Sequence, residues 1–220
     1  MDLVRFDALP PSAEPLRGRL RLRASGTLAQ GVVVLCHPHP AFGGNMDVWL
    51  LPTLSHALAE DGWTVLRFDF RSVEHGVQSA DHREELEDLA GAVAYLRTHG
   101  FLGPDDRLVM AGWSFGALVS LLYGLDDPQV TDWVGLAPPT QPLGELAMAA
   151  LPVPRIAQWS ARRIAIVGEH DQFFPPSSLG SVSPHQTYVL EHCDHFFFDR
   201  DVELAQLLVA ALRAPHRDAA

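Results

Sequence analysis

The pattern that most constrains the fold of this 220-residue chain is Gly-x-Ser-x-Gly at Gly112–Gly116. A run of strand character, Arg107–Ala111, precedes it, and the segment Ala117–Tyr123 that follows predicts a helix. A tight turn between a strand and a helix strains the central residue, and flanking glycines allow the backbone to approach closely. This context is typical of a nucleophile elbow with the serine at its apex. Ser114 is therefore the candidate nucleophile.

Strand and helix patterns alternate along the whole sequence, which predicts an α/β fold with a mostly parallel sheet covered by helices on both faces. The expected strands are Val4–Ala8, Arg17–Ala24, Gly31–Cys36, Trp63–Phe70, Arg107–Ala111, Asp132–Leu136, Arg163–Val167 and Gln186–Leu190. The expected helices are Val48–Glu60, Glu84–Arg97, Ala117–Tyr123 and Val202–Leu212. Because the sequence shows neither an internal repeat nor a linker, residues 1–220 are predicted to form one domain.

The composition limits the kinds of partner. The formal net charge is −11 and lysine is absent, so no basic patch is available for a nucleic acid or an anionic membrane surface. No apolar stretch approaches the length of about 18 residues that a membrane span needs, and no leader pattern opens the chain. Cys36 and Cys193 are too few for a disulfide framework. We expect a cytoplasmic monomer or homodimer.

A nucleophilic serine needs a general base, and the base needs a carboxylate that orients it. After a nucleophile elbow the acid comes next in the chain and the histidine last, each at the end of a strand. Asp171 follows the expected strand that ends at Val167, and His195 follows the one that ends at Leu190. This order identifies Asp171 as the acid and His195 as the base. Weaker candidates for these two roles are Glu169, His170, His192 and Asp194.

An oxyanion hole needs two backbone N–H groups. Phe115, directly after the nucleophile, is expected to supply one of them. The other should come from the loop that follows the strand ending at Cys36, where Pro38 and Pro40 have no N–H to donate. His39 is the preferred donor in that loop, and Ala41 is the second choice.

The neighbouring residues His37 and His39 also suggest a metal site, because histidine is a common zinc ligand. A pair of histidines with no third ligand nearby in the sequence is weak support for such a site. The oxyanion interpretation is therefore preferred, and neither a metal nor a cofactor is expected.

Several segments together resemble the small, lidless α/β-hydrolases of the bacterial alpha/beta superfamily, which includes esterase-like, dienelactone-hydrolase-like and serine-aminopeptidase-like relatives. These segments are CHPHPAFGGNM, FDFRSVEHG, ELEDLAGAVAYL, AGWSFGA, LAPPT, GEHD and CDHFFF. The resemblance runs from about Gly31 to the closing helix. It implies a single-domain α/β-hydrolase fold without a substantial cap domain. It also implies an esterase-like serine hydrolase with Ser114, Asp171 and His195 as its triad.

Two features depart from the pattern of this family. Glu74 and His75 replace the glycine end of the loop that follows Phe70, which predicts a different rim at the site. The interval of 24 residues between Asp171 and His195 is short. The segment Phe173–Pro184 is therefore expected to be a turn where relatives carry a fuller helix.

The connection between Leu136 and Arg163 is too short and too rich in proline for a cap domain, although Leu143–Leu151 could form one short helix over the site. Aromatic residues and prolines near the expected triad are candidate pocket walls. The preferred ones are Phe42, Pro138, Phe173 and Phe196, and further candidates are Phe115, Pro139 and Phe174.

These residues predict a serine hydrolase that cleaves carboxylic esters through an acyl-enzyme. A site without a lid favours small-molecule esters with short acyl groups or the exposed ends of larger esters, polyesters included. A peptidase or a thioesterase would use the same triad, so the sequence does not separate these activities. A third alternative is a non-catalytic binding module built on the same fold.

Overall fold

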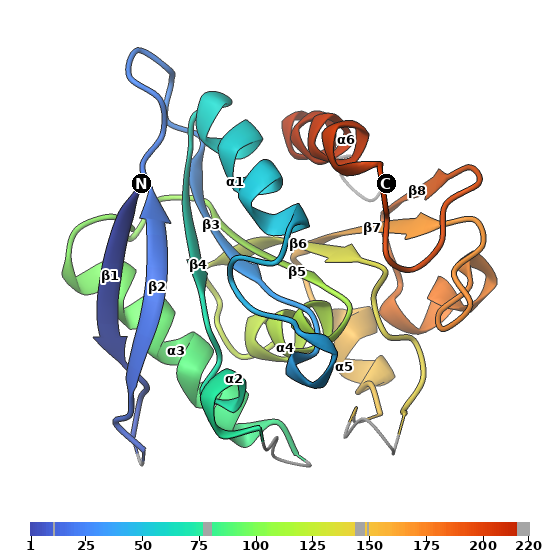
Figure 1. Cartoon of the computed structure of the whole chain (residues 1–220), viewed down its shortest axis with the longest axis horizontal. Coiled ribbons are helices and arrows are strands. Elements are labelled where there is room, and N and C mark those ends of the chain that lie inside the picture. The colour runs from blue at the N-terminus through green and yellow to red at the C-terminus, as the bar shows by residue number, and fades with distance from the viewer. Residues whose placement is uncertain (11, 77–80, 144–147, 149, 215–220) are drawn as a thin grey trace.

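The computed structural model describes residues 1–10, 12–76, 81–143, 148 and 150–214. Its centre is an eight-stranded sheet with the strand order β1-β2-β4-β3-β5-β6-β7-β8, shown in Figure 1. The strands are β1 (Asp2–Asp7), β2 (Pro15–Arg21), β3 (Gly31–Cys36), β4 (Trp63–Phe68), β5 (Leu108–Trp113), β6 (Val130–Leu136), β7 (Arg162–Gly168) and β8 (Gln186–Leu190).

The direction of the strands divides the sheet into two parts. β1 and β2 form an antiparallel pair, and β2 also pairs antiparallel with β4. All strands from β3 to β8 run parallel to their neighbours. Buried residues fill β3 and β5 on both faces, whereas buried and more exposed residues alternate along β2. The parallel part brings the carboxyl ends of its strands to one edge of the sheet, where ligands bind in folds of this class.

Helices cover both faces of the sheet, as Figure 1 shows. The helices are α1 (Leu50–Glu60), α2 (Ser72–His75), α3 (Arg83–Thr98), α4 (Phe115–Gly124), α5 (Val153–Gln158) and α6 (Asp201–Arg213). Two 3-10 turns, η1 (Pro40–Phe42) and η3 (Pro176–Val182), lie in the loops. α1 and α6 share one apolar core, and α3, α4 and α5 share the other. Among the described residues no helix has the length and apolar character needed to cross a membrane.

The eight strands and the four principal helices that the sequence predicts are all present, and most of their ends move by a few residues. The loop expected after Phe70 contains the short helix α2, and residues 77–80 of that loop lie outside the described residues. α5 was not predicted, because Pro152 and Pro154 indicated a break in this segment. Pro154 lies in the first turn of α5, where a proline does not disrupt the helix.

The expected helix over Leu143–Leu151 falls largely on residues 144–147 and 149, which the structure does not describe. Leu143 and Met148, which are described, pair with each other as an antiparallel bridge, so the helix is wrong at these two positions. The segment Phe173–Pro184 contains η3 in place of a full helix, as the short interval predicted.

Candidate active site

The backbone places Ser114 at the apex of a sharp turn between β5 and α4. Ser114 has φ 51° and ψ −115°, a strained conformation for a residue with a side chain. Its N–H donates to the carbonyl oxygen of Leu136 at 2.8 Å, which anchors the turn to the end of β6. A Cβ on Gly112 would collide with the carbonyl group of Gly116, and a Cβ on Gly116 would lie 2.5 Å from the carbonyl oxygen of Cys36. Both glycines are therefore required by close backbone contacts.

Ser114, His195 and Asp171 form a continuous chain of hydrogen bonds. The Nε2 atom of His195 lies 2.9 Å from Ser114 Oγ, and its Nδ1 atom lies 2.8 Å from Asp171 Oδ2. The three residues are 5%, 5% and 3% exposed, respectively. When Nδ1 donates its proton to the carboxylate, Nε2 is the free acceptor for the serine hydroxyl. The structure thus brings together the three residues predicted as the triad.

The two oxygens of Asp171 have separate partners. Oδ1 accepts hydrogen bonds from the backbone N–H groups of Phe173 and Phe174 at 2.9 and 2.8 Å. Oδ2 accepts from His195. These contacts fix the orientation of the carboxylate and leave one oxygen directed at the imidazole.

The two weaker candidates for the acid, Asp194 and Glu169, bond to other partners. Asp194 Oδ1 accepts from the N–H of Phe196 at 2.9 Å. Glu169 is exposed and accepts from the N–H of His192 at 2.9 Å. Neither carboxylate has the two-sided contact to a backbone turn and to His195 that Asp171 has.

The loop that carries His195 lies across the end of β7. A Cβ on Gly168 would collide with the carbonyl group of Cys193, so this crossing requires the glycine. The N–H of His170 donates to the same carbonyl oxygen at 2.8 Å. The indole N–H of Trp113 donates to the carbonyl oxygen of His195 at 3.2 Å. The acid loop and the base loop are therefore joined by backbone contacts next to the elbow.

His37 is a buried structural residue. Its Nε2 atom accepts from the N–H of Phe70 at 3.2 Å, so its Nδ1 atom carries the proton and donates to the carbonyl oxygen of Pro38 at 2.7 Å. Burial lowers the pKa of His37 to about 4. Because both ring nitrogens bond to the protein, His37 has no nitrogen to offer a metal in this arrangement.

The loop after β3 brings His39 next to the elbow. The His39 ring contacts the Phe115 ring edge-on, with 5.1 Å between the ring centroids. The N–H of Ala41 donates to His39 Nδ1 at 3.1 Å, which removes Ala41 as the second choice for an oxyanion donor. Phe115 is the first residue of α4, so its N–H lies directly after Ser114. His39 lines the pocket that contains Ser114. The assignment of these two N–H groups to an oxyanion hole stays a prediction.

An apolar pocket of about 310 Å³ opens at Ser114 and His195. The expected wall residues Phe42, Phe173 and Phe196 line it, and Phe174 does so as well. Pro138 does not. It is buried at the end of β6, where its side chain packs beside Gly135. The lining also includes Pro38, Val48, Trp49, Trp113, Leu143, Met148 and Phe198, none of which the sequence analysis named as a wall residue.

Stacked aromatic side chains form one side of this pocket. Trp49 and Phe198 stack with their ring centroids 5.8 Å apart and their planes at 16°. Phe196 stacks on Phe198 at 5.7 Å and 25°. The side chains of residues Phe196 and Phe198 reach the pocket, whereas Phe197 between them is fully buried. In the sequence, the run of three consecutive phenylalanines, Phe196–Phe198, is the pattern that could have indicated Phe198 as a lining residue.

Glu74 and His75, which depart from the family pattern, lie away from the pocket lining. Glu74 pairs with Arg17 at 3.3 Å, and the His75 Nε2 atom lies 2.5 Å from an oxygen of Glu14. The hydrogen bond to Glu14 raises the pKa of His75. These contacts attach α2 to the chain around β2, so the expected change at the rim does not reach the described lining.

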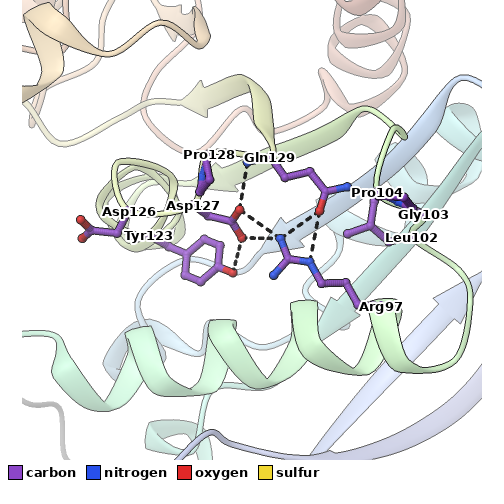
Figure 2. A pocket seen from close by; sticks show the side chains of 9 residues that line it. All are labelled: Arg97, Leu102, Gly103, Pro104, Tyr123, Asp126, Asp127, Pro128 and Gln129. Atoms are coloured by element: carbon purple, nitrogen blue, oxygen red, sulfur yellow. Dashed lines mark hydrogen bonds and ion pairs between the residues drawn. The ribbon is translucent and has the colours of Figure 1, made fainter.

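A larger and more open hollow of about 940 Å³ lies where α3 and α4 end and β6 begins, and Ser114 is not among its described lining residues. Figure 2 shows the residues that line it. Four of its polar side chains, those of Arg97, Tyr123, Asp127 and Gln129, form one hydrogen-bonded network. Arg97 contacts Asp127 at 2.8 Å and Gln129 at 2.9 Å, and the Tyr123 hydroxyl donates to Asp127 at 2.7 Å. Burial raises the pKa of Tyr123 above its usual range. The described lining residues include no serine, cysteine or histidine.

The comparison with protein families agrees with this geometry. The family model described as the alpha/beta hydrolase fold matches residues 31–155, a span that begins at β3 and contains the elbow. The chain belongs to the alpha/beta-hydrolase fold family. The predicted resemblance and the predicted fold class are thereby confirmed.

Solved structures of bacterial α/β-hydrolases are similar over nearly the whole chain. An alpha-beta serine hydrolase homologue from Coxiella burnetii is 26% identical, with 96% of this chain and 97% of that chain covered and a TM-score of 0.76. XC6422 from Xanthomonas campestris, described as a serine hydrolase without a lid, is 27% identical. It covers 96% of this chain and 93% of its own, also with a TM-score of 0.76.

Two further relatives give no information about the activity of this chain. An uncharacterized protein from Rickettsia prowazekii is 26% identical over 184 residues, which are 80% of this α/β-hydrolase and 76% of the relative. The esterase domain of a Rhodothermus marinus protein is 18% identical, with 96% of each chain covered and a TM-score of 0.73. This last likeness shows the fold alone.

Proposed function

We propose that this α/β-hydrolase cleaves carboxylic esters through an acyl-enzyme formed on Ser114. The observation that carries the proposal is the hydrogen-bonded chain from Ser114 through His195 to Asp171. Ser114 Oγ attacks the ester carbonyl while His195 Nε2 takes the hydroxyl proton. The tetrahedral intermediate collapses, and His195 returns that proton to the departing alcohol. His195 then takes a proton from water while the water oxygen attacks the acyl group to give a second tetrahedral intermediate. As this intermediate collapses, His195 returns the proton to Ser114 Oγ, and the acid departs from the restored serine.

Asp171 keeps His195 in the tautomer that this cycle requires. Its carboxylate accepts a hydrogen bond from the Nδ1–H group and stabilises the imidazolium that forms when Nε2 also carries a proton. The Phe115 N–H lies at the start of α4, where the helix dipole favours negative charge. With the His39 N–H it would bind the oxyanion that develops on the carbonyl oxygen.

The shape and the chemistry of the pocket favour neutral, compact esters. Its volume of about 310 Å³ is at the small end of ligand sites, which range over roughly 300–1,000 Å³. Its described lining residues are apolar or aromatic apart from Ser114, His39 and His195. We therefore propose short acyl groups or the exposed ends of larger esters, polyesters included, as substrates.

The same lining argues for an ester over the other substrates of a serine triad. Among the lining residues that the structure describes, none is a carboxylate that would bind the amino terminus of a peptide. None is an arginine that would bind the phosphates of a thioester carrier. An ester with apolar substituents needs neither group.

Labelling with a fluorophosphonate probe tests the proposal against a binding module that has no turnover. The wild type should react once at Ser114, and Ser114→Ala should not react while its melting temperature stays unchanged. Hydrolysis of p-nitrophenyl butyrate should fall by about 10⁴-fold or more in Ser114→Ala. A wild type that neither reacts with the probe nor cleaves esters would be a binding module. Measuring kcat/KM on peptide and thioester substrates with the same acyl group then separates esterase activity from peptidase and thioesterase activity.

A further inference from the structure

Beside the candidate active site, three exposed side chains with metal-binding atoms converge. Glu169 and His170 follow β7, and His192 follows β8. One ligand atom of each lies within 4.8 Å of the others. His170 Nε2 is 3.8 Å and His192 Nδ1 is 3.9 Å from Glu169 Oε2. The three residues take no part in the triad and do not line the pocket.

The backbone holds these three residues together before any ligand binds. β7 and β8 pair in parallel with Gly168 opposite Leu190, and the Glu169 N–H donates to the Leu190 carbonyl oxygen at 2.9 Å. The His192 N–H donates to Glu169 Oε2 at 2.9 Å. His192 adopts φ 54°, an uncommon conformation for a residue with a side chain. The two loops are therefore fixed at the points where the ligands begin.

We propose that Glu169, His170 and His192 bind one divalent transition-metal ion, with Zn²⁺ as the reference ion. Two imidazoles and a carboxylate suit Zn²⁺, Co²⁺ and Ni²⁺, whereas Mg²⁺ and Ca²⁺ prefer oxygen ligands throughout. Metal–ligand distances of about 2.0–2.2 Å bring donor atoms to roughly 3–3.6 Å from one another. Exposed side chains reach that spacing from the present one by small rotations. Water completes the coordination, because the side chains are 62%, 45% and 84% exposed for His170, Glu169 and His192.

A metal ion at this site would link the two loops that carry Asp171 and His195. His170 immediately precedes Asp171, and His192 is three residues before His195. An ion that joins the two histidines therefore joins the loop of the acid to the loop of the base. It would bind the folded chain in preference to the unfolded one, and so raise the melting temperature.

The experiment uses untagged protein, Co²⁺ as a spectroscopic probe and Zn²⁺ as a competitor. Wild type should show a saturable visible Co²⁺ spectrum with one ion per chain, which Zn²⁺ abolishes. Zn²⁺ at about 100 times its dissociation constant should raise the melting temperature by roughly 5–10 °C. His192→Ala and Glu169→Gln should bind at least about tenfold more weakly and lose most of this rise.

The matched control is His56→Ala on α1. His56 and Glu60 form a pair 4.0 Å apart with both side chains 62% exposed, and neither belongs to the three-residue group. His56→Ala should bind Co²⁺ like the wild type. The melting temperature of each variant without metal shows that it is folded. No Co²⁺ spectrum in the wild type, or equal affinity in wild type and His192→Ala, would overturn the proposal. Protein labelled at Ser114 should still bind the ion, which separates this site from the triad.

Discussion

The imidazole of His37 accepts a hydrogen bond from the backbone N–H of Phe70 at 3.2 Å and joins the loop after β3 to the end of β4. The two rings also contact each other edge-on, with 4.9 Å between their centroids. The other ring nitrogen holds the Pro38 carbonyl group, one residue before His39. His37 therefore positions the segment that brings His39 to the elbow, provided that its ring is neutral.

The first prediction follows from that neutrality. His37 has a pKa of about 4 in the folded chain, against the ordinary value of 6.5. Between these values the unfolded chain binds the additional proton, so the contribution of His37 to stability is present above pH 6.5 and is lost as the pH falls towards 4. The resulting loss in the free energy of unfolding is on the order of 3 kcal/mol. His37→Gln should have a lower free energy of unfolding than wild type at pH 7.5. The difference between the two proteins should become smaller by pH 4.5.

Urea unfolding of both proteins at pH 7.5, 6.5, 5.5 and 4.5 measures this gap. Titratable groups other than His37 are common to both proteins and cancel in the comparison. A constant difference across the series would mean that His37 does not carry the pH dependence.

The second prediction concerns the acid of the proposed triad. Asp171→Asn should lower kcat for ester hydrolysis by about 10⁴-fold, because an amide neither fixes the tautomer of His195 nor stabilises its protonated form. Its oxygen can still accept from the Phe173 and Phe174 N–H groups, so the loop should stay folded.

Asp194→Asn is the matched control, since Asp194 adjoins His195 but bonds to the N–H of Phe196. It should cost less than about tenfold in kcat. Steady-state kinetics of both variants, together with their melting temperatures, decide the assignment. A greater loss in Asp194→Asn than in Asp171→Asn would move the acid to position 194.

The third prediction tests the close contact between the elbow and the loop after β3. A Cβ on Gly116 would lie 2.5 Å from the carbonyl oxygens of both Cys36 and His37, which are backbone atoms that cannot rotate away. Gly116→Ala should therefore lower the free energy of unfolding by about 1–3 kcal/mol or more and reduce ester hydrolysis. Gly180→Ala, where no atom lies within 4 Å of the new Cβ, should stay within about 0.5 kcal/mol of wild type. Equal stability of the two variants would show that the elbow has room for a side chain.

Local patterns predicted the sheet, and they predicted that Ser114, Asp171 and His195 lie together, because both depend on chain order. β3 has the predicted bounds Gly31–Cys36, since Gly31 is followed by five apolar residues that are all buried. Asp171 and His195 follow strands in the order that the elbow requires, and parallel pairing then brings their loops together.

The pocket walls depend on packing between segments that are distant in the sequence. Trp49 lines the site because it stacks on Phe198, which belongs to the loop after β8. Pro138 was expected at the site, but the turn after β6 buries it. No periodicity in the sequence encodes either contact. α5 was missed for a different reason, because proline in a first turn resembles a helix break when only the sequence is read.

The fourth prediction concerns the length of the acyl chain. While a chain lengthens inside the pocket, each methylene that leaves water gains about 0.8 kcal/mol, or roughly fourfold in kcat/KM. Beyond the pocket mouth, where Phe42 and Phe198 are 69% and 62% exposed, further methylenes stay largely in water.

We therefore expect kcat/KM for p-nitrophenyl esters to peak at roughly two to six acyl carbons, as the pocket of about 310 Å³ fills. Trp49→Ala removes one wall and should weaken the dependence on chain length, whereas Val202→Ala on the exposed surface of α6 should leave the profile unchanged. Activity should not jump when a substrate exceeds its solubility limit, because we expect no lid that would have to open over the site. Initial rates from acetate to palmitate, measured on both sides of that limit, test these points. A steady rise in kcat/KM to long-chain esters would contradict the short-chain prediction and show that the aromatic side chains around Trp49 and Phe198 form a groove for the chain.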